Sequence, residues 1–167
     1  MRIPKAILVI SIVSVILASA AFFPVTALEQ YITTAELIQN SPYTAHVRVD
    51  ESTGSNGVRD YRLIVLETFR GQLPEEIQVR VLQSSRVVDP DGTKDPYGSE
   101  WIVILGEKNS LGFYPLRSLA WAKIELLWDS DKEEMILARP ITGFPPASRS
   151  GGIYSLSEFR RLLAVRP

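Results

Sequence analysis

The chain has 167 residues, of which 46% are hydrophobic and 22% are charged, and its formal net charge is −1. This length allows one domain with a sizeable core and is short for two, and the composition is typical of a folded protein. The absence of cysteine excludes disulfides, thiol nucleophiles and cysteine-ligated metals. No basic stripe is present, so we expect no nucleic-acid ligand.

Residues 1–27 have the pattern of an export signal. Arg2 and Lys5 give a positive start, residues 6–23 are uncharged and apolar, and residues 25–27 (VTA) suit a signal peptidase. An uncleaved N-terminal anchor is the alternative, because about 18 apolar residues are near the lower limit for a membrane span. We therefore expect an extracytoplasmic protein, periplasmic or secreted. Membrane contact is expected only through this segment, if it is not cleaved.

Residues 28–167 are predicted to form a single β-rich domain that begins with a short helix. Thr33 can cap this helix and Glu36 completes the capping-box pattern. A strand follows over residues 43–49, where apolar and polar residues alternate. His46, the only histidine, lies on the polar side of that strand. We predict a surface position for it, with a ligand or binding contact as the alternative.

Two strands over residues 61–68 and 77–82 are predicted to form an antiparallel pair, because the turn between them is too short for a crossover helix. The first has apolar residues on both sides, which predicts a central strand covered on both faces. The glycine-rich residues 51–57 before it predict a flexible loop.

Three further strands are predicted over residues 100–106, 118–128 and 135–141, with a short helix as the alternative for the second. Residues 129–134 form a charged hairpin turn between the last two. Ser155 and Glu158 then make a second capping box that opens a C-terminal helix. The apolar stripe of this helix comprises Leu156, Phe159, Leu162 and Leu163.

These elements predict a mainly β fold: a small antiparallel barrel or sandwich of five to seven strands, with a short N-terminal helix and a C-terminal helix. A barrel has the advantage that it removes open sheet edges.

The order of these elements, together with two short motifs, resembles that of a known group of proteins. A strand ends in Phe69-Arg70-Gly71 before a second strand, and Gly98-Ser99-Glu100 precedes a very apolar one. Over most of residues 35–163 the chain resembles uncharacterised secreted bacterial proteins whose domain is similar to the netrin and metalloproteinase-inhibitor OB barrels. This resemblance implies an OB-like barrel and an extracytoplasmic binding role. The inhibitors of that superfamily act through an N-terminal cysteine, which this chain lacks, so no functional residue carries over.

One loop partly matches a calcium-binding loop. Oxygen-bearing residues stand at loop positions 1, 3, 5, 7 and 12, which are Asp89, Asp91, Thr93, Asp95 and Glu100. Lys94 occupies the position that favours glycine, and two prolines interrupt the loop. A solvated turn is therefore the favoured interpretation, and calcium is the alternative.

Other candidate residues have simple structural explanations. Five aromatic residues could line a sugar- or peptide-binding face, but their strand spacing favours the core: Tyr97, Trp101, Tyr114, Trp121 and Trp128. The acidic residues of the 129–134 turn could act as paired carboxylates, but we expect them to be hydrated. Ser84 and Ser85 lack the Gly-x-Ser-x-Gly context of a nucleophile.

We expect a non-catalytic exported domain that binds a protein or cell-envelope partner through its loops or an exposed strand edge. No catalytic or cofactor-binding residue is assigned. The alternative is a small extracytoplasmic hydrolase or metal-dependent enzyme that uses His46 with a carboxylate.

Overall fold

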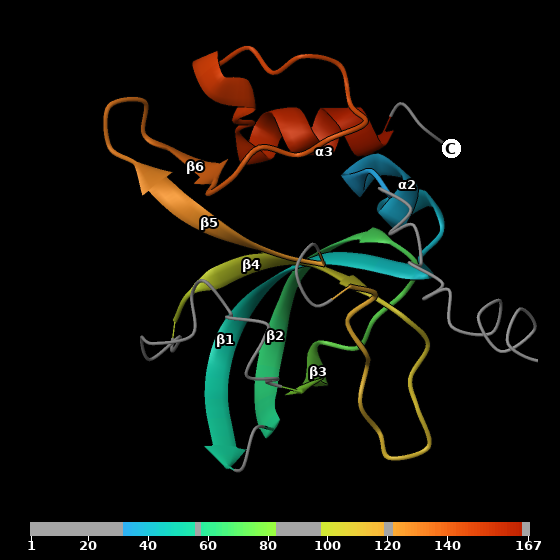
Figure 1. Ribbon diagram of the computed structural model, residues 1–167. Coiled ribbons are helices and arrows are strands. Elements are labelled where there is room, and N and C mark those ends of the chain that lie inside the picture. Colours follow the sequence, from blue (N-terminus) through green and yellow to red (C-terminus); the bar gives the residue numbers. More distant parts are fainter. Residues whose placement is uncertain (1–31, 56–57, 83–97, 119–121, 165–167) are drawn as a thin grey trace, which may run out of the picture. The chain divides into compact units, whose positions relative to one another are not determined.

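Strands dominate the computed structural model, which describes residues 32–55, 58–82, 98–118 and 122–164 (Figure 1). The predicted mainly β fold with a helix near each end of this part is confirmed. The elements are α2 (Thr34–Gln39), β1 (Tyr43–Ser55), β2 (Val58–Arg70), β3 (Glu76–Leu82), β4 (Glu100–Leu105), β5 (Lys123–Asp129), β6 (Glu134–Leu137), a 3-10 turn (Ser150–Gly152) and α3 (Leu156–Ala164).

The six strands form one antiparallel sheet in the order β3-β2-β1-β4-β5-β6. The predicted antiparallel pairing of residues 61–68 with residues 77–82 is confirmed as the β2–β3 pair. The strand that is buried on both faces is β4, whereas the outward side chains of β2 are half-exposed. The prediction that residues 61–68 are covered on both faces is therefore wrong.

The sheet is open, so the predicted closure into a barrel, or division into a two-sheet sandwich, is wrong. The β3 edge meets residues 113–116 at a single bridge, Val79 to Tyr114, and the same segment bridges Leu105 through Leu116. Pro115 in this segment has no N–H to donate, which does not favour a continuous ladder. The β6 edge has one bridge, from Ile136 to Ser155. Loop segments thus cover part of both edges, which is a common alternative to closure.

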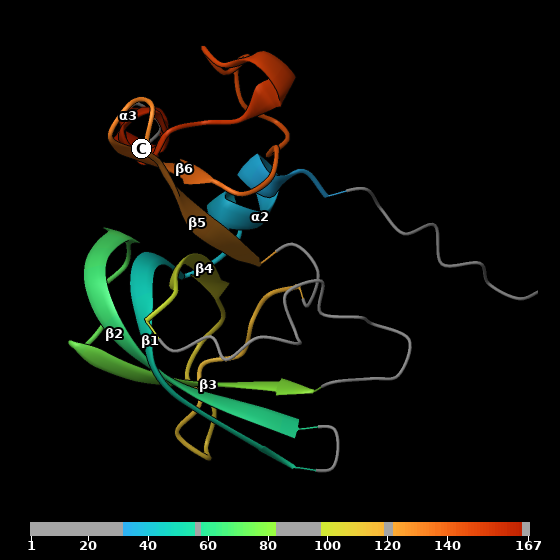
Figure 2. The same ribbon diagram turned by 90° about the vertical axis from the view of Figure 1, so that its left-hand side faces the viewer.

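The β1–β2 hairpin is longer than the sequence pattern predicts. Residues 51–55 continue β1, so the prediction of a loop over residues 51–57 is wrong for most of that segment. The ladder between the strands has three irregularities, one of which lies between His46 and Val47. Such bulges bend and twist a strand pair. The curved hairpin extends away from both helices (Figures 1 and 2).

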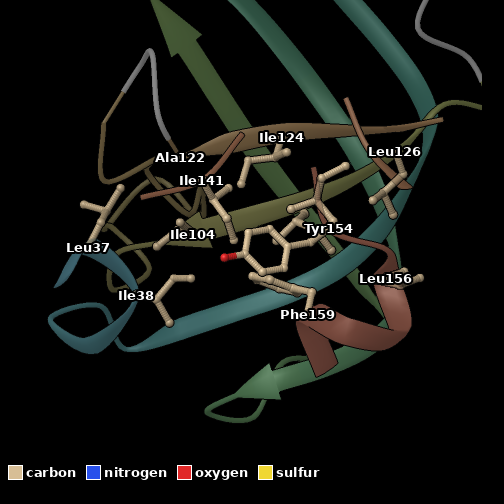
Figure 3. Packing of buried hydrophobic residues seen from close by; sticks show 12 residues of the cluster. Leu37, Ile38, Ile104, Ala122, Ile124, Leu126, Ile141, Tyr154, Leu156 and Phe159 are labelled. Carbon is tan, nitrogen blue, oxygen red and sulfur yellow. The ribbon is translucent and has the colours of Figure 1, made fainter. Parts of the chain in front are cut away.

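Two hydrophobic clusters lie on opposite faces of the sheet, because the side chains of β4 alternate between them. Cluster A lies under the two helices and contains Leu37, Ile38, Ile102, Ile104, Ala122, Ile124, Leu126, Leu137, Ile141, Tyr154, Leu156 and Phe159. Cluster B contains Ala45, Val47, Val49, Tyr61, Leu63, Ile77, Val79, Trp101, Val103, Leu105 and Tyr114. Figure 3 shows Ile38 of α2 and Phe159 of α3 pointing into cluster A.

Both predicted capping boxes are confirmed. In α2, the Glu36 N–H donates to Thr33 Oγ1 at 3.2 Å and the Thr33 N–H donates to Glu36 Oε2 at 2.8 Å. In α3, Ser155 and Glu158 exchange the same two bonds at 3.1 and 2.9 Å. These bonds satisfy N–H groups that the first turn of a helix leaves without partners.

Candidate functional site

His46 is buried and paired with Glu100, which corrects the prediction of a surface histidine. Its Nε2 lies 2.7 Å from Glu100 Oε2, and the two side chains are 8% and 28% exposed. The imidazole projects from β1 on the face opposite Ala45 and Val47, so it lies on the helix-covered side of the sheet. The alternation correctly placed His46 on the face opposite Ala45 and Val47. However, α3 and the β5–β6 hairpin pack on that same face, so it is not a solvent-exposed face.

The second imidazole nitrogen faces the protein interior. His46 Nδ1 is buried and, within the described residues, has no hydrogen-bond partner. Thr44 Oγ1, two residues earlier on β1, is also buried and has no hydrogen-bond partner within the described residues. The hydrogen bond to Glu100 is therefore the one side-chain bond of the imidazole within the described residues.

This geometry suits a structural pair better than an acid–base catalyst. A general base needs a ring nitrogen within reach of a substrate proton. In His46, Nε2 bonds the carboxylate and Nδ1 is buried. The pair instead joins β1 to the first residue of β4. The sequence contained no signal for this pairing, because the two residues are 54 positions apart.

Only one of the five candidate calcium ligands, Glu100, lies within the described residues. Asp89, Asp91, Thr93 and Asp95 lie outside the described residues, as do Ser84 and Ser85. Glu100 is described, and its carboxylate bonds His46. Among the described residues, no group of three or more histidine and carboxylate side chains is arranged to hold a metal ion.

The aromatic candidates separate into core and surface. Trp101 is buried against Tyr61, with ring centroids 5.1 Å apart, and Tyr114 is buried against Tyr43 at 5.6 Å. The core interpretation is confirmed for these two. Trp128 is 62% exposed, so the core interpretation is wrong for it. Tyr97 and Trp121 lie outside the described residues.

Arg149 fixes the two ends of the 129–134 turn. Its Nη1 donates to Asp129 Oδ2 at 2.5 Å and its Nη2 donates to Glu134 Oε1. The Arg149 hydrogen bond is the main reason why the pKa of Asp129 lies below its ordinary value. A proton-donating carboxyl group in a glycosidase requires the opposite shift. The prediction that these acids are simply hydrated is wrong for Asp129 and Glu134, and the role of Arg149 was not predicted.

The clamped hairpin presents apolar side chains to solvent. Trp128 pairs with Met135 across the strands, and Leu127 pairs with Ile136. Leu127 is 45% exposed, and Met135 and Ile136 are partly exposed. Successive strand residues point to opposite faces, so Trp128 and Met135 share one face of the hairpin and Leu127 and Ile136 share the other. We call Trp128 and Met135 the hairpin patch.

The curved β1–β2–β3 surface carries a polar hollow of about 270 Å³, lined partly by Glu51, Asp60, Arg62 and Glu76. Its charges are largely paired with one another. Arg62 bonds Asp50 at 2.5 Å and lies 3.2 Å from Glu51, and Arg80 holds Asp60 with two bonds of 2.7 Å. Most of the charge in this hollow is therefore neutralised within the protein.

A second hollow is apolar and has a volume of about 220 Å³. It lies between α2, the end of β2, Phe144 and the end of α3, and we call it the helix groove. Its lining residues are Ala35, Ile38, Gln39, Phe69, Arg70, Phe144 and Leu163.

Comparison of the chain with protein-family models, curated proteins and solved structures found no match. The resemblance to netrin-like barrels therefore stays a prediction. No helix within the described ranges is long and apolar enough to cross a membrane. The predicted export segment, residues 1–27, lies outside those ranges.

Proposed function

We propose that the chain is an exported, non-catalytic domain that binds a protein partner of the cell envelope through the hairpin patch. The observation that carries this proposal is the exposure of Trp128 on a hairpin whose ends are fixed by Arg149. The expected export signal supports the compartment. The resemblance to netrin-like domains supports a binding role.

The chemistry of the hairpin patch suits a protein interface. Tryptophan is among the residues that most often dominate binding energy at protein interfaces, because its large surface is removed from water on contact. The Arg149 clamp orders the hairpin before binding, which reduces the entropy cost of association. The sheet edges are weaker candidates than the sequence alone suggested, because loop segments already bridge them.

The test is retention of a partner by the immobilised exported chain from an envelope extract of the producing organism. We expect a partner that wild type retains and that Trp128→Ala loses by about tenfold or more. Leu111→Ala is the matched control, because Leu111 is 71% exposed but lies in the 109–113 turn, outside the patch. It should retain the partner fully.

Two results would contradict the proposal. One is the same set of retained proteins for wild type and Trp128→Ala. The other is self-association of the purified chain in sedimentation velocity that Trp128→Ala abolishes, because the patch would then bind a second copy of the chain.

The second candidate function is a hydrolase that uses His46 with Glu100. The 2.7 Å contact brings the imidazole and the carboxyl group together as such an enzyme needs, whereas the burial of Nδ1 favours the structural role. Its test is hydrolysis of a panel of chromogenic ester and phosphoester substrates by wild type and by His46→Gln. A rate that His46→Gln lowers at least about a hundredfold would support it. Equal rates for the two proteins would exclude it.

A further inference from the structure

The helix groove has an apolar interior and a polar rim. Its apolar lining comprises Ala35, Ile38, Phe69, Phe144 and Leu163, which come from both helices, the end of β2 and the 144 loop. The two polar lining residues, Gln39 and Arg70, are both exposed. The groove is thus an opening into the side of cluster A, next to a positive charge.

The walls of the helix groove are held in place by contacts outside it. The Phe69 and Phe144 rings both pack edge-on against Phe159, with centroids 5.5 and 6.3 Å away. On the α2 side, the Ala35 N–H donates to the Thr142 carbonyl at 3.1 Å. A hollow with walls fixed in this way is available to a ligand without rearrangement of the core.

Arg70 is the group that defines the ligand. Within the described residues its side chain makes no hydrogen bond or ion pair, although three other arginines of the sheet and helices hold carboxylates: Arg62 bonds Asp50, Arg80 bonds Asp60, and Arg160 bonds Glu67. A guanidinium presents several N–H donors in a fork that matches a carboxylate. An apolar hollow beside such a group fits a ligand with a hydrocarbon tail and one carboxylate.

We infer that the helix groove binds an unbranched medium-chain monocarboxylate, with its tail among Ile38, Phe69 and Leu163 and its carboxylate on Arg70. A cavity of about 150 Å³ holds one benzene ring. A volume of about 220 Å³ therefore has room for a tail of roughly six to eight carbons. This site is separate from the hairpin patch, and the inference goes beyond the proposed function.

The direct test is an NMR titration of the exported chain with sodium octanoate. With about ten non-hydrogen atoms, octanoate is expected to bind one site with a Kd of about 1 mM or below. The largest amide shifts should fall on residues of the helix groove. The neutral analogue 1-octanol should bind about tenfold more weakly, and acetate, which has no tail, should not bind in the same range.

Four substitutions, at three positions, test the separate parts of the site. Arg70→Gln should remove the preference for octanoate over 1-octanol, while Arg48→Gln, which changes an exposed arginine on β1, should keep it. Gln39→Trp places a large side chain at the rim and should abolish binding, while Gln39→Ala should not. All three changed positions are on the surface, so the four variants are expected to fold.

Several results would overturn the inference. The first is the absence of shifts up to 10 mM octanoate, roughly tenfold above the weakest expected Kd. The second is equal affinity for octanoate and 1-octanol in wild type, which would mean that Arg70 selects nothing. The third is octanoate binding only to a chain that ends at residue 164, because residues 165–167 would then be the occupant. Trp128→Ala should leave octanoate binding unchanged, so this test and that of the hairpin patch fail independently.

Discussion

At the scale of single residues, the His46–Glu100 pair is the least expected feature of the chain. A polar group on a strand is usually hydrated, but this imidazole is covered by the elements that pack on the same face. Its hydrogen bond to Glu100 offsets part of the cost of burial. Removal of one partner should therefore cost more than the bond itself contributes.

We expect Glu100→Ala to lower the free energy of unfolding by about 1–3 kcal/mol, because both ring nitrogens of His46 then lack a protein partner. Urea denaturation at pH 7 measures this loss. Arg48→Ala on the same strand is the control and should stay within about 0.5 kcal/mol of wild type, because its side chain is exposed. Equal stability of the two variants would show that the pair contributes nothing.

Asp129 gives a prediction about pH, because Arg149 holds the pKa of its carboxyl group below the ordinary value. A lowered pKa in the folded state means that the unfolded state binds the proton more readily. The resulting stabilisation is complete above the unfolded pKa of about 3.9 and is lost as the pH falls through the lower folded value.

We expect Arg149→Gln to be less stable than wild type at pH 7, and the difference in melting temperature to shrink as the pH falls below about 4. Thermal unfolding between pH 7 and pH 2 measures this difference. A carbon-detected NMR titration of Asp129 is the independent readout. A constant difference at all pH values, or an unshifted Asp129 carboxyl group in wild type, would disprove the linkage.

At the scale of elements, the N-terminal end of α2 depends on a residue more than a hundred positions away. Gly143 has φ +81°, and a Cβ atom on it would lie 2.6 Å from Thr33 Oγ1 and 2.9 Å from Ala35 Cβ. Thr33 Oγ1 is the atom that caps the helix. Any side chain at position 143 would therefore displace the capping residue.

We expect Gly143→Ala to lower the free energy of unfolding by about 2–3 kcal/mol, from backbone strain and loss of the cap together. Gly112→Ala is the matched control. Gly112 has φ +90°, and a Cβ there would meet nothing closer than Lys108 Cε at 4.0 Å. It should cost only the strain, about 1 kcal/mol. Chemical denaturation compares the two, and equal losses would show that the clash with Thr33 is relieved.

At the scale of the whole molecule, cluster A joins the sheet to both helices. Phe159 is fully buried and contacts Phe69 at the end of β2 and Phe144 in the loop before α3. Small elements such as α2, with six residues, are not stable alone. Their stability comes from packing against this shared cluster.

We expect Phe159→Ala to cost about 3–5 kcal/mol, which is a large share of the stability of an ordinary domain. Because that variant can fail to fold, Phe159→Leu provides a measurable second step of about 1–2 kcal/mol. Trp128→Ala is the contrast, since its side chain is mostly solvated, and should change stability by less than about 0.5 kcal/mol. A loss for Trp128→Ala as large as that for Phe159→Leu would mean that Trp128 supports the core.

Local patterns predicted the elements because each depends on neighbours in the chain. The capping boxes of Thr33 and Ser155 need partners only three residues on, and strand alternation depends on side chains that point to opposite faces. The antiparallel pairing of residues 61–68 and 77–82 followed from a short turn. These were the reliable predictions.

The candidate sites were predicted less well because they join distant residues. Arg149 lies 20 positions from Asp129 and His46 lies 54 positions from Glu100, so no spacing rule connects them. Trp128 alternates with its neighbours as a core residue does. It lies near the end of β5, however, and its side chain is exposed to solvent.

The sequence by itself determined that this protein is a cysteine-free, antiparallel β protein with two capped helices, because propensity, alternation and capping act over a few residues. Only the tertiary structure decided that the sheet stays open, that His46 is buried, and that an apolar groove opens beside Arg70. Those features depend on which surfaces meet, and the packing free energy of distant segments decides that.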